Sequence, residues 1–181
     1  MERNFVLVAL FAALIAALGL VPNVTLAFGV PISAQSLGVM LAGTVLGARR
    51  GALAVLLFLL LPAIGLPVLS GGRGGIGVFV GPTAGFLIGF PIAAFVTGWI
   101  TERLLSAPVF WAASFGALIG GIFVLYLPGI LWLAVTLDKS LYETLLLMAP
   151  FIPGDIIKVV LAGGITATLV KWRPGSVPTR A

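Results

Sequence analysis

The chain has 181 residues, of which 61% are hydrophobic and 8% are charged, and its mean hydropathy is +1.26. Soluble domains carry about a quarter charged residues, so this composition excludes a soluble domain and predicts an integral membrane protein. Cysteine and histidine are both absent, which excludes disulfides, thiol chemistry, zinc sites and histidine bases. The net charge of +5 lies in loops between apolar runs, as orientation signals do, and does not indicate nucleic-acid binding.

Six apolar segments follow one another and predict an all-α fold, a six-helix transmembrane bundle. At about 20 residues per span, the chain has room for about five to seven helices, so we expect residues 1–181 to form a single transmembrane domain. The first segment follows Arg3 as a signal peptide would, but Val21-Pro22-Asn23 is a poor cleavage site, and we expect a retained span. The segments are Phe5–Val21, Ser33–Leu46, Ala52–Leu69, Ala84–Thr101, Val109–Val135 and Thr144–Lys171, the last interrupted by Pro150 and Pro153.

Basic residues in the loops predict the orientation, with both termini in the cytoplasm. In that orientation seven basic residues lie inside and two lie in outer loops, which satisfies the positive-inside rule, whereas the opposite orientation fails it. Lys158 lies within the sixth segment, near its outer end. The inner residues are Arg3, Arg49, Arg50, Arg103, Lys171, Arg173 and Arg180, and the outer ones are Arg73 and Lys139.

Three stretches rich in proline and glycine come together on the outer side in this topology. They are the loop Pro22–Pro31, the glycine-rich loop Ser70–Gly77 and the head of the sixth segment, Pro153–Lys158. Irregular backbone at membrane depth is tolerated only against protein or beside a water-filled cavity. The sequence therefore predicts an outward-facing pocket with a lid.

Asp155 and Lys158 are the first candidates for a site in that pocket. Their separation of three residues puts both on one face of a helix. A charge at the bilayer centre costs about 2.5–3.5 kcal/mol on insertion scales, so intramembrane charges indicate function. The alternative is a structural ion pair, or two residues snorkelling to the interface. We favour a pocket in which Asp155 accepts hydrogen bonds and Lys158 donates them.

The run Gly71-Gly72-Arg73-Gly74-Gly75 is the second candidate. Its glycines permit close approach of backbone to a ligand, and Arg73 would pair with a carboxylate in a forked geometry. No Gly-Lys-Ser/Thr follows, so the run does not match a phosphate-binding loop. An ordinary mobile loop is the alternative.

Uncharged polar residues flank the second segment, with Ser33 and Gln35 at its outer start and Asn23 and Thr25 in the loop before it. They would either satisfy backbone groups or bond a ligand, and both interpretations stay open. Phe86 is expected in the core or facing lipid, although it lies near the glycine-rich loop.

The first segment carries small residues at four-residue spacing. Ala9, Ala13 and Ala17 form one ladder, and Ala12 and Ala16 form a second ladder on the adjacent face of the helix. Such ladders let two membrane helices approach closely. Packing within the bundle and docking to a partner membrane protein are both open from the spacing.

Several separate motifs, in order along the chain, resemble the biotin transporter family, whose members are the substrate-binding S components of energy-coupling-factor (ECF) transporters. The similarity covers most of 30–103 and then the head of the sixth segment. The motifs are Val30-Pro31-Ile32-Ser33-Ala34-Gln35 with Gly38, Leu46-Gly47-Ala48-Arg49-Arg50-Gly51, Gly65-Leu66-Pro67-Val68, Gly81-Pro82-Thr83-Ala84-Gly85-Phe86-Leu87 with Gly89-Phe90, and Pro153-Gly154-Asp155 with Lys158.

The resemblance implies six helices with both termini inside, in the bacterial cytoplasmic membrane, and biotin as the ligand at the outer side. It also implies partners besides membrane lipid, namely a transmembrane coupling protein and two cytoplasmic ATPases, with an alanine ladder of the first helix contacting the coupling protein. That ladder maps onto Ala9, Ala13 and Ala17, or onto the adjacent pair. With the residue arguments above, the expected ligand-binding set is Asp155, Lys158, Arg73, Gln35, Gly72, Gly74 and Phe86, without a metal or cofactor.

Two departures from the family pattern concern the site. The family often has Gly-Gly-Tyr where this chain has Ala84-Gly85-Phe86, so a tyrosine hydroxyl is missing, and it also carries neutral polar residues near Arg73. In biotin, the ureido ring offers two N–H donors that suit Asp155 and a carbonyl that suits Lys158, which leaves the valerate carboxylate to Arg73 or to backbone N–H groups. The reverse assignment, with Lys158 on the carboxylate, stays open.

Two other classes of protein are alternatives to a vitamin-binding transport component. A membrane-embedded enzyme would have only Asp155, Lys158 and hydroxyl side chains to work with, so we expect no enzyme. A proton-coupled or solitary secondary carrier for a small carboxylated solute would use Asp155 as a relay and would need no ATPase. The chain itself has no Walker motif, so any ATP must be used by a partner.

Overall fold

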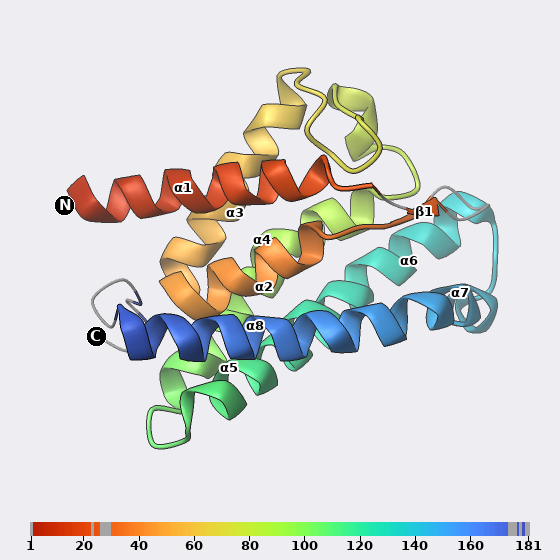
Figure 1. Ribbon diagram of the computed structural model, residues 1–181. Coiled ribbons are helices and arrows are strands. Elements are labelled where there is room, and N and C mark those ends of the chain that lie inside the picture. Colours follow the sequence, from red (N-terminus) through yellow and green to blue (C-terminus); the bar gives the residue numbers. More distant parts are fainter. Residues whose placement is uncertain (1, 23, 26–29, 174–176, 178, 180–181) are drawn as a thin grey trace.

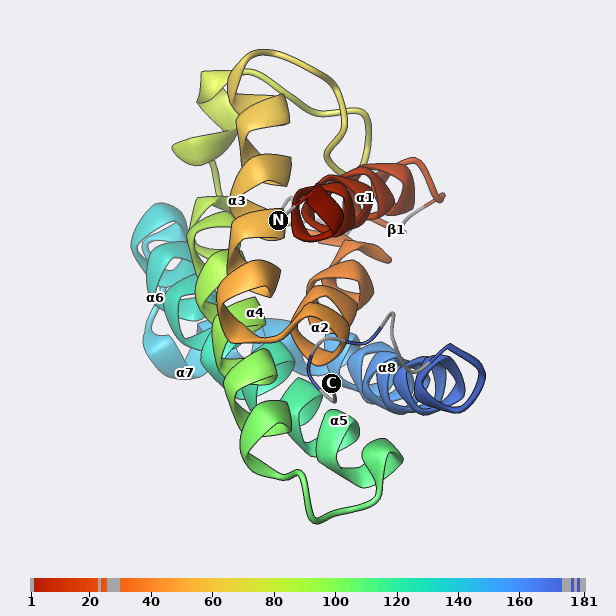
Figure 2. The same ribbon diagram turned by 90° about the vertical axis from the view of Figure 1, so that its left-hand side faces the viewer.

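The computed structural model describes residues 2–22, 24–25, 30–173, 177 and 179 (Figures 1 and 2). These residues form six helical segments, as the sequence predicted. The first four are α1 (Glu2–Gly19), α2 (Gln35–Leu46), α3 (Ala48–Ala63) and α4 (Ala84–Arg103). The fifth runs without a break through α5 (Val109–Leu118), the π-helical turn η2 (Ile119–Val124) and α6 (Leu125–Leu137). The sixth joins α7 (Leu141–Met148), the 3-10 turn η3 (Ala149–Phe151) and α8 (Ile152–Trp172).

Four of the segments are long and apolar enough to cross a membrane: Glu2–Gly19, Ala84–Arg103, Val109–Leu137 and Leu141–Trp172. The helix α2 has 12 residues and α3 has 16. At 1.5 Å per residue they reach about 18 and 24 Å, less than the hydrocarbon core of about 30 Å. The six predicted helical segments are present, and the crossing of the membrane by α2 and α3 stays a prediction. Glycines at positive φ shorten this pair, because Gly47 (φ 88°) ends α2 and Gly65 (φ 101°) lies just beyond α3.

A two-stranded ribbon replaces part of the loop predicted between the first two segments. Strand β1 (Val24–Thr25) pairs antiparallel with β2 (Pro31–Ile32). This ribbon is a small exception to the all-α prediction. Asn23 and Arg180, which the sequence analysis singled out, lie outside the described residues, as do 26–29.

The prolines of the sixth segment do not interrupt it. Pro150 and Pro153 both fall in the first positions of helical turns, in η3 and α8 respectively. A proline there has no intrahelical hydrogen bond to lose, and its fixed φ suits the helix. The segment therefore continues from α7 into α8, and Asp155 lies in the first turn of α8.

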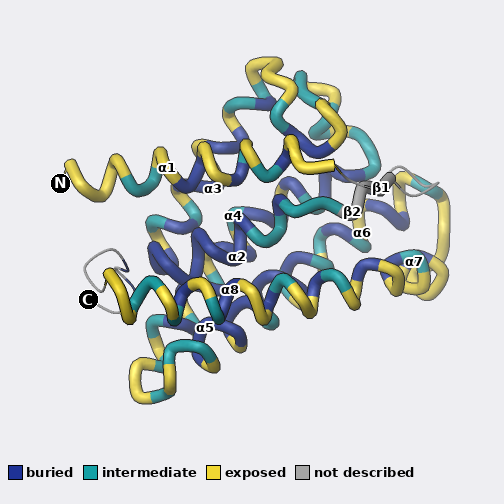
Figure 3. The backbone as a smooth tube through the Cα atoms, viewed as in Figure 1, coloured by how far each residue is buried: buried dark blue, intermediate teal, exposed yellow. Residues whose placement is uncertain are grey.

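The helix α2 lies at the centre of the bundle (Figure 3). All of its residues from Gly38 to Leu46 are buried, and α1, α3, α4 and α8 pack around it. A helix that is apolar all round is suited to such a central position, since it has no face that prefers water. The central position of α2 brings its first turn, with Gln35 and Ser36, against the head of α8.

The first turn of α1 and the last turn of α8 lie at the same end of the bundle, on the left of Figure 1. The ribbon and the α6–α7 turn lie at the opposite end. An even number of helical segments requires this arrangement of the termini. The cytoplasmic location of this end of the bundle stays a prediction from the loop charges.

Candidate functional site

A cavity lies at the end of the bundle opposite the termini, between α2, the 64–83 loop, α4, α6 and the head of α8. It contains about 620 Å³ of empty space, including space open to solvent. Its walls are largely apolar. They consist of Val30, Ser33, Gln35, Ser36, Leu69, Ser70, Arg73, Thr83, Phe86, Leu87, Phe90, Leu125, Tyr126, Met148, Phe151, Asp155 and Lys158.

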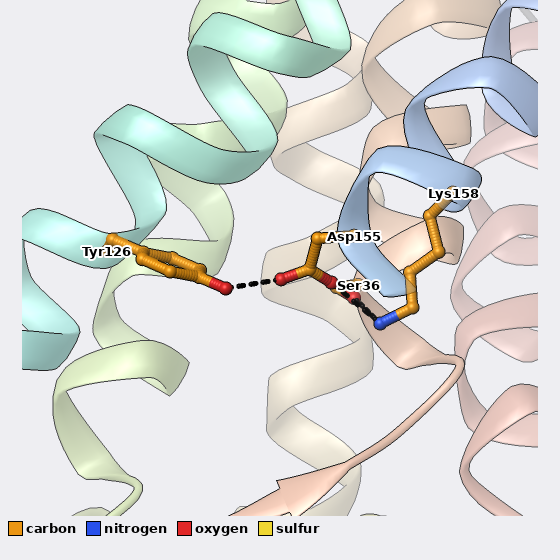
Figure 4. Close-up of polar contacts among 4 residues, drawn as sticks. All are labelled: Ser36, Tyr126, Asp155 and Lys158. Atoms are coloured by element: carbon orange, nitrogen blue, oxygen red, sulfur yellow. Dashed lines mark hydrogen bonds and ion pairs between the residues drawn. The ribbon is translucent and has the colours of Figure 1, made fainter. Parts of the chain in front are cut away.

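Asp155 and Lys158 form an ion pair on the cavity wall (Figure 4). Nζ of Lys158 lies 2.8 Å from Oδ1 of Asp155 and donates a second hydrogen bond of 2.9 Å to the hydroxyl of Ser36. The other carboxylate oxygen, Oδ2, accepts a 2.5 Å hydrogen bond from the hydroxyl of Tyr126. The side chains of Asp155 and Lys158 are 8% and 14% exposed. Within the described part of the chain, these contacts leave one N–H of Lys158 available to a ligand.

Local structure explains how these groups meet. Asp155 lies in the first turn of α8, one helical turn before Lys158 on the same face. Tyr126 is the second residue after the π-helical turn η2, which holds an extra residue per turn and so changes the direction of every side chain after it by about 100°. The position of Tyr126 opposite Asp155 therefore depends on η2.

Arg73 is the other cationic residue on the cavity wall, besides Lys158. Its Nε donates to the carbonyl oxygen of Ser70 at 3.1 Å, and Nη1 donates to the hydroxyl of Thr83 at 3.2 Å. These contacts orient the guanidinium group and leave both N–H groups of Nη2 without an acceptor among the described residues. Burial lowers the pKa of Arg73, although an arginine keeps its charge in proteins.

Gln35, on the cavity wall, connects three parts of the chain. Its Nε2 donates to the carbonyl oxygens of Ile15 and Val68, and its Oε1 accepts from the backbone N–H of Ser70 at 2.9 Å. Gln35 is 3% exposed, so both of its N–H groups are satisfied by the protein itself. Of the two roles left open for Gln35, the contacts support the satisfaction of backbone groups. A ligand contact from it stays a prediction that rests on the remaining lone pair of Oε1.

Ser70 offers a hydroxyl that has no partner. Its Oγ is one of three buried side-chain oxygens without a hydrogen-bond partner among the described residues, the others belonging to Thr97 and Ser114. Of these three residues, Ser70 lines the cavity. A buried polar atom without a partner costs about 1–3 kcal/mol, and a ligand group would remove that cost.

Phe86 packs edge-on against Tyr126, with ring centroids 6.3 Å apart and an angle of 88° between the planes. Phe86 lies directly over Gly129, where any Cβ would collide with its ring. Position 86 therefore provides an apolar wall. The phenolic hydroxyl that the sequence lacks at position 86 is present in the same cavity on Tyr126.

The structure brings most of the predicted site residues together. Asp155, Lys158, Arg73, Gln35 and Phe86 all line the cavity. Gly72 and Gly74 do not line it. Gly72 is exposed at the loop tip, whereas Gly74 lies so close to the carbonyl oxygen of Leu66 that a side chain would collide with it. The role of these two glycines in the structure is to shape the loop that carries Arg73.

Sequence reasoning missed Tyr126, Ser36, Ser70 and Thr83. Thr83 lies within the motif Gly81–Leu87 and Ser70 begins the glycine-rich loop Ser70–Gly77, so both positions carried a usable signal. Tyr126 had no such signal, because it lies 29 residues before Asp155 in an apolar helix. Among the described residues, no group of three Asp, Glu, His or Cys side chains forms a metal site.

The structure distinguishes the two alanine ladders of α1. Ala9, Ala13 and Ala17 are exposed on the outer face of the helix. Ala12 is 3% exposed and Ala16 is half-buried, and both pack against the core. The first ladder is therefore open to a partner, and the second holds α1 on the bundle.

The charges on the cavity wall do not cancel. Of the residues that line it, Arg73 and Lys158 are cationic and Asp155 is anionic. The excess of one positive charge in a largely apolar cavity suits a ligand with one negative charge and an apolar body.

Known proteins resemble this chain over nearly its full length. The pattern that defines the BioY family matches residues 2–175. A protein of Rhodobacter capsulatus named biotin transporter BioY is 58% identical, covering 99% of this chain and 100% of the relative. A protein of the same name from Rhizobium etli is 53% identical, covering 99% of this chain and 98% of the relative.

A solved structure has the same fold. It is the crystal structure of the S-component for biotin from an ECF-type ABC transporter, with a TM-score of 0.88 and 34% sequence identity. The match covers 94% of this chain and 92% of that one. With the family pattern and the relatives, this shows that the chain belongs to the BioY family.

Proposed function

We propose that this protein binds biotin in the cavity and acts as the substrate-binding S component of an ECF transporter for biotin uptake. The observation that carries the proposal is the cavity itself, with apolar walls and one excess positive charge from Arg73, Lys158 and Asp155. Biotin is a monocarboxylic acid with an apolar chain and a polar ureido ring. The names of the relatives and of the solved structure support the same ligand.

The hydrogen-bond contacts support one direction of binding. Asp155 is the only acidic residue among the described cavity residues, so it suits the two ureido N–H groups, with Lys158 donating its free N–H to the ureido carbonyl. Arg73 has a planar fork with Nη2 available, which suits the valerate carboxylate. The unpartnered hydroxyl of Ser70 lies on the cavity wall as a further donor.

Equilibrium binding of labelled biotin to the purified protein tests the function. We expect one molecule of biotin per chain. Asp155→Asn and Lys158→Ala should each weaken binding by orders of magnitude while the protein remains extractable and folded. Asp138→Asn and Lys139→Ala remove a neighbouring acid and base outside the cavity and serve as matched controls. Wild-type affinity in both cavity variants would refute the site.

A ligand series tests the direction of binding. Biotinamide lacks the carboxylate but keeps the ureido ring, so the wild-type protein should bind it more weakly than biotin. If Arg73 holds the carboxylate, Arg73→Gln should bind biotin and biotinamide equally, whereas Lys158→Gln should still prefer biotin. The opposite pattern would assign the carboxylate to Lys158.

Uptake requires an energy source that the chain does not contain, and we infer a coupling protein with two cytoplasmic ATPases. The exposed ladder Ala9, Ala13 and Ala17 supports docking of that coupling protein on α1. The basic residues near the termini support cytoplasmic ends and a position in the bacterial cytoplasmic membrane. Biotin uptake by proteoliposomes that contain this chain alone, driven by a proton gradient, would instead identify a solitary carrier.

A further inference from the structure

A second cleft lies at the end of the bundle that holds the termini, the end that faces the viewer in Figure 2. It contains about 1120 Å³, including space open to solvent. The first turn of α1, the start of α3 and the end of α4 form its walls. It is polar, unlike the first cavity, and three arginines line it against one glutamate: Arg49, Arg50, Arg103 and Glu102.

The protein itself holds these charged groups in place. Nε of Arg50 donates to the carbonyl oxygen of Leu46 at 3.1 Å, and its Nη1 donates to the side-chain oxygen of Asn4 at 3.2 Å. The guanidinium group of Arg103 lies 4.9 Å from the centroid of the Trp99 ring, and Glu102 accepts from the backbone N–H of Ala48. Glu102 thus binds a backbone group and, among the described residues, forms no ion pair with the arginines.

An apolar stripe leaves this cleft along α4. Phe95 and Trp99 line the cleft, and Ile88 and Ile92 continue the same helix face toward the middle of the bundle. All four side chains are 42–50% exposed. Tryptophan is enriched where membrane meets water, so Trp99 marks the depth at which lipid headgroups end and acyl chains begin.

We propose that the cleft binds the phosphate of an anionic phospholipid headgroup, with an acyl chain of that lipid along the α4 stripe. Arginine is the side chain best suited to phosphate, because its planar fork donates two parallel hydrogen bonds. Basic pockets between transmembrane helices bind anionic headgroups on the same principle. The combination of a polar cationic cleft and an adjoining apolar stripe matches a lipid. It does not match free phosphate, which has no apolar part. The proposal is independent of the ligand in the first cavity.

Native mass spectrometry of the detergent-purified chain tests the proposal. The protein is titrated with phosphatidylglycerol and, separately, with phosphatidylcholine of the same acyl chains. We expect about a tenfold preference for phosphatidylglycerol. The double variant Arg50→Gln, Arg103→Gln should lose most of this preference for phosphatidylglycerol. The double variant Arg3→Gln, Lys171→Gln removes the same charge at the same end but outside the cleft, and should keep it.

Trp99 provides a second measurement that reports position. In a variant with Trp111, Trp132 and Trp172 changed to Phe, brominated phosphatidylglycerol should quench Trp99 fluorescence at about tenfold lower mole fraction than brominated phosphatidylcholine. Equal binding of both lipids by the wild-type protein would overturn the proposal. An equal loss of the phosphatidylglycerol preference in the cleft variant and in its control would also overturn it. Competition by inorganic phosphate as strong as by phosphatidylglycerol would overturn the role of the acyl chain. Loss of copurifying coupling protein with an unchanged lipid preference would assign the cleft to a protein partner.

Discussion

The hydroxyl of Tyr126 on α6 donates a hydrogen bond of 2.5 Å to Oδ2 of Asp155 on α8, while Lys158 occupies the other carboxylate oxygen. The carboxylate is therefore held from two sides before any ligand binds. A ligand N–H would use the remaining lone pairs of a carboxylate whose direction is already set. Preorganisation of this kind reduces the entropy lost on binding.

Replacement of Tyr126 by Phe should weaken biotin binding by about tenfold to a hundredfold, because a hydrogen bond to a charged group contributes about 1.5–3 kcal/mol. The ring and its contact with Phe86 would remain. The matched control is Tyr142→Phe, since the chain has two tyrosines and Tyr142 is 70% exposed. Isothermal titration of both variants with biotin checks the prediction. Equal biotin affinities of Tyr126→Phe and Tyr142→Phe would remove Tyr126 from the site.

The ion pair should behave as a unit in stability measurements without ligand. Lys158→Met leaves the buried carboxylate of Asp155 without its cation, which should lower the free energy of unfolding by about 3 kcal/mol. The double variant Asp155→Asn, Lys158→Met removes both charges and should unfold at a higher temperature than Lys158→Met alone. Thermal unfolding in detergent measures this difference. A double variant less stable than the single one would show that each charge stabilises the fold independently.

The unpartnered hydroxyl of Ser70 should matter to ligand binding and not to the fold. Ser70→Ala removes a group that has no hydrogen bond in the structure, so the unfolding temperature without ligand should stay the same or rise. Biotin affinity should fall by about threefold to tenfold if the hydroxyl meets the ligand. Ser114→Ala removes another buried unpartnered hydroxyl that does not line the cavity, and its affinity should match the wild type.

The two alanine ladders should respond differently to a larger side chain. Ala13→Leu adds volume on the exposed face of α1, so biotin binding and stability should remain while copurification with a coupling protein is lost. Ala12→Leu adds the same volume inside the core, where overpacking costs about 1–3 kcal/mol. Thermal unfolding together with pull-down of the coupling protein separates the two effects. Normal pull-down by Ala13→Leu would place the docking surface elsewhere.

Composition and apolar runs were sufficient to predict six helical segments with both termini at one end, since membrane helices satisfy their own backbone hydrogen bonds and so must be long apolar stretches. Their lengths were less predictable. The sequence alone did not show that Gly47 joins α2 directly to α3, or that the chain stays helical through Pro150 and Pro153. These outcomes depend on individual φ angles and on where a proline falls within a turn.

The pairing of Asp155 with Lys158 was determined by the sequence, because residues three apart share a helix face in any fold. The partners that complete the polar wall were decided by tertiary structure alone. Tyr126 reaches Asp155 across 29 positions of chain and only after a π-helical turn, and Lys158 meets Ser36 across 122. Contacts between distant segments follow from how helices pack around α2, which no local spacing encodes.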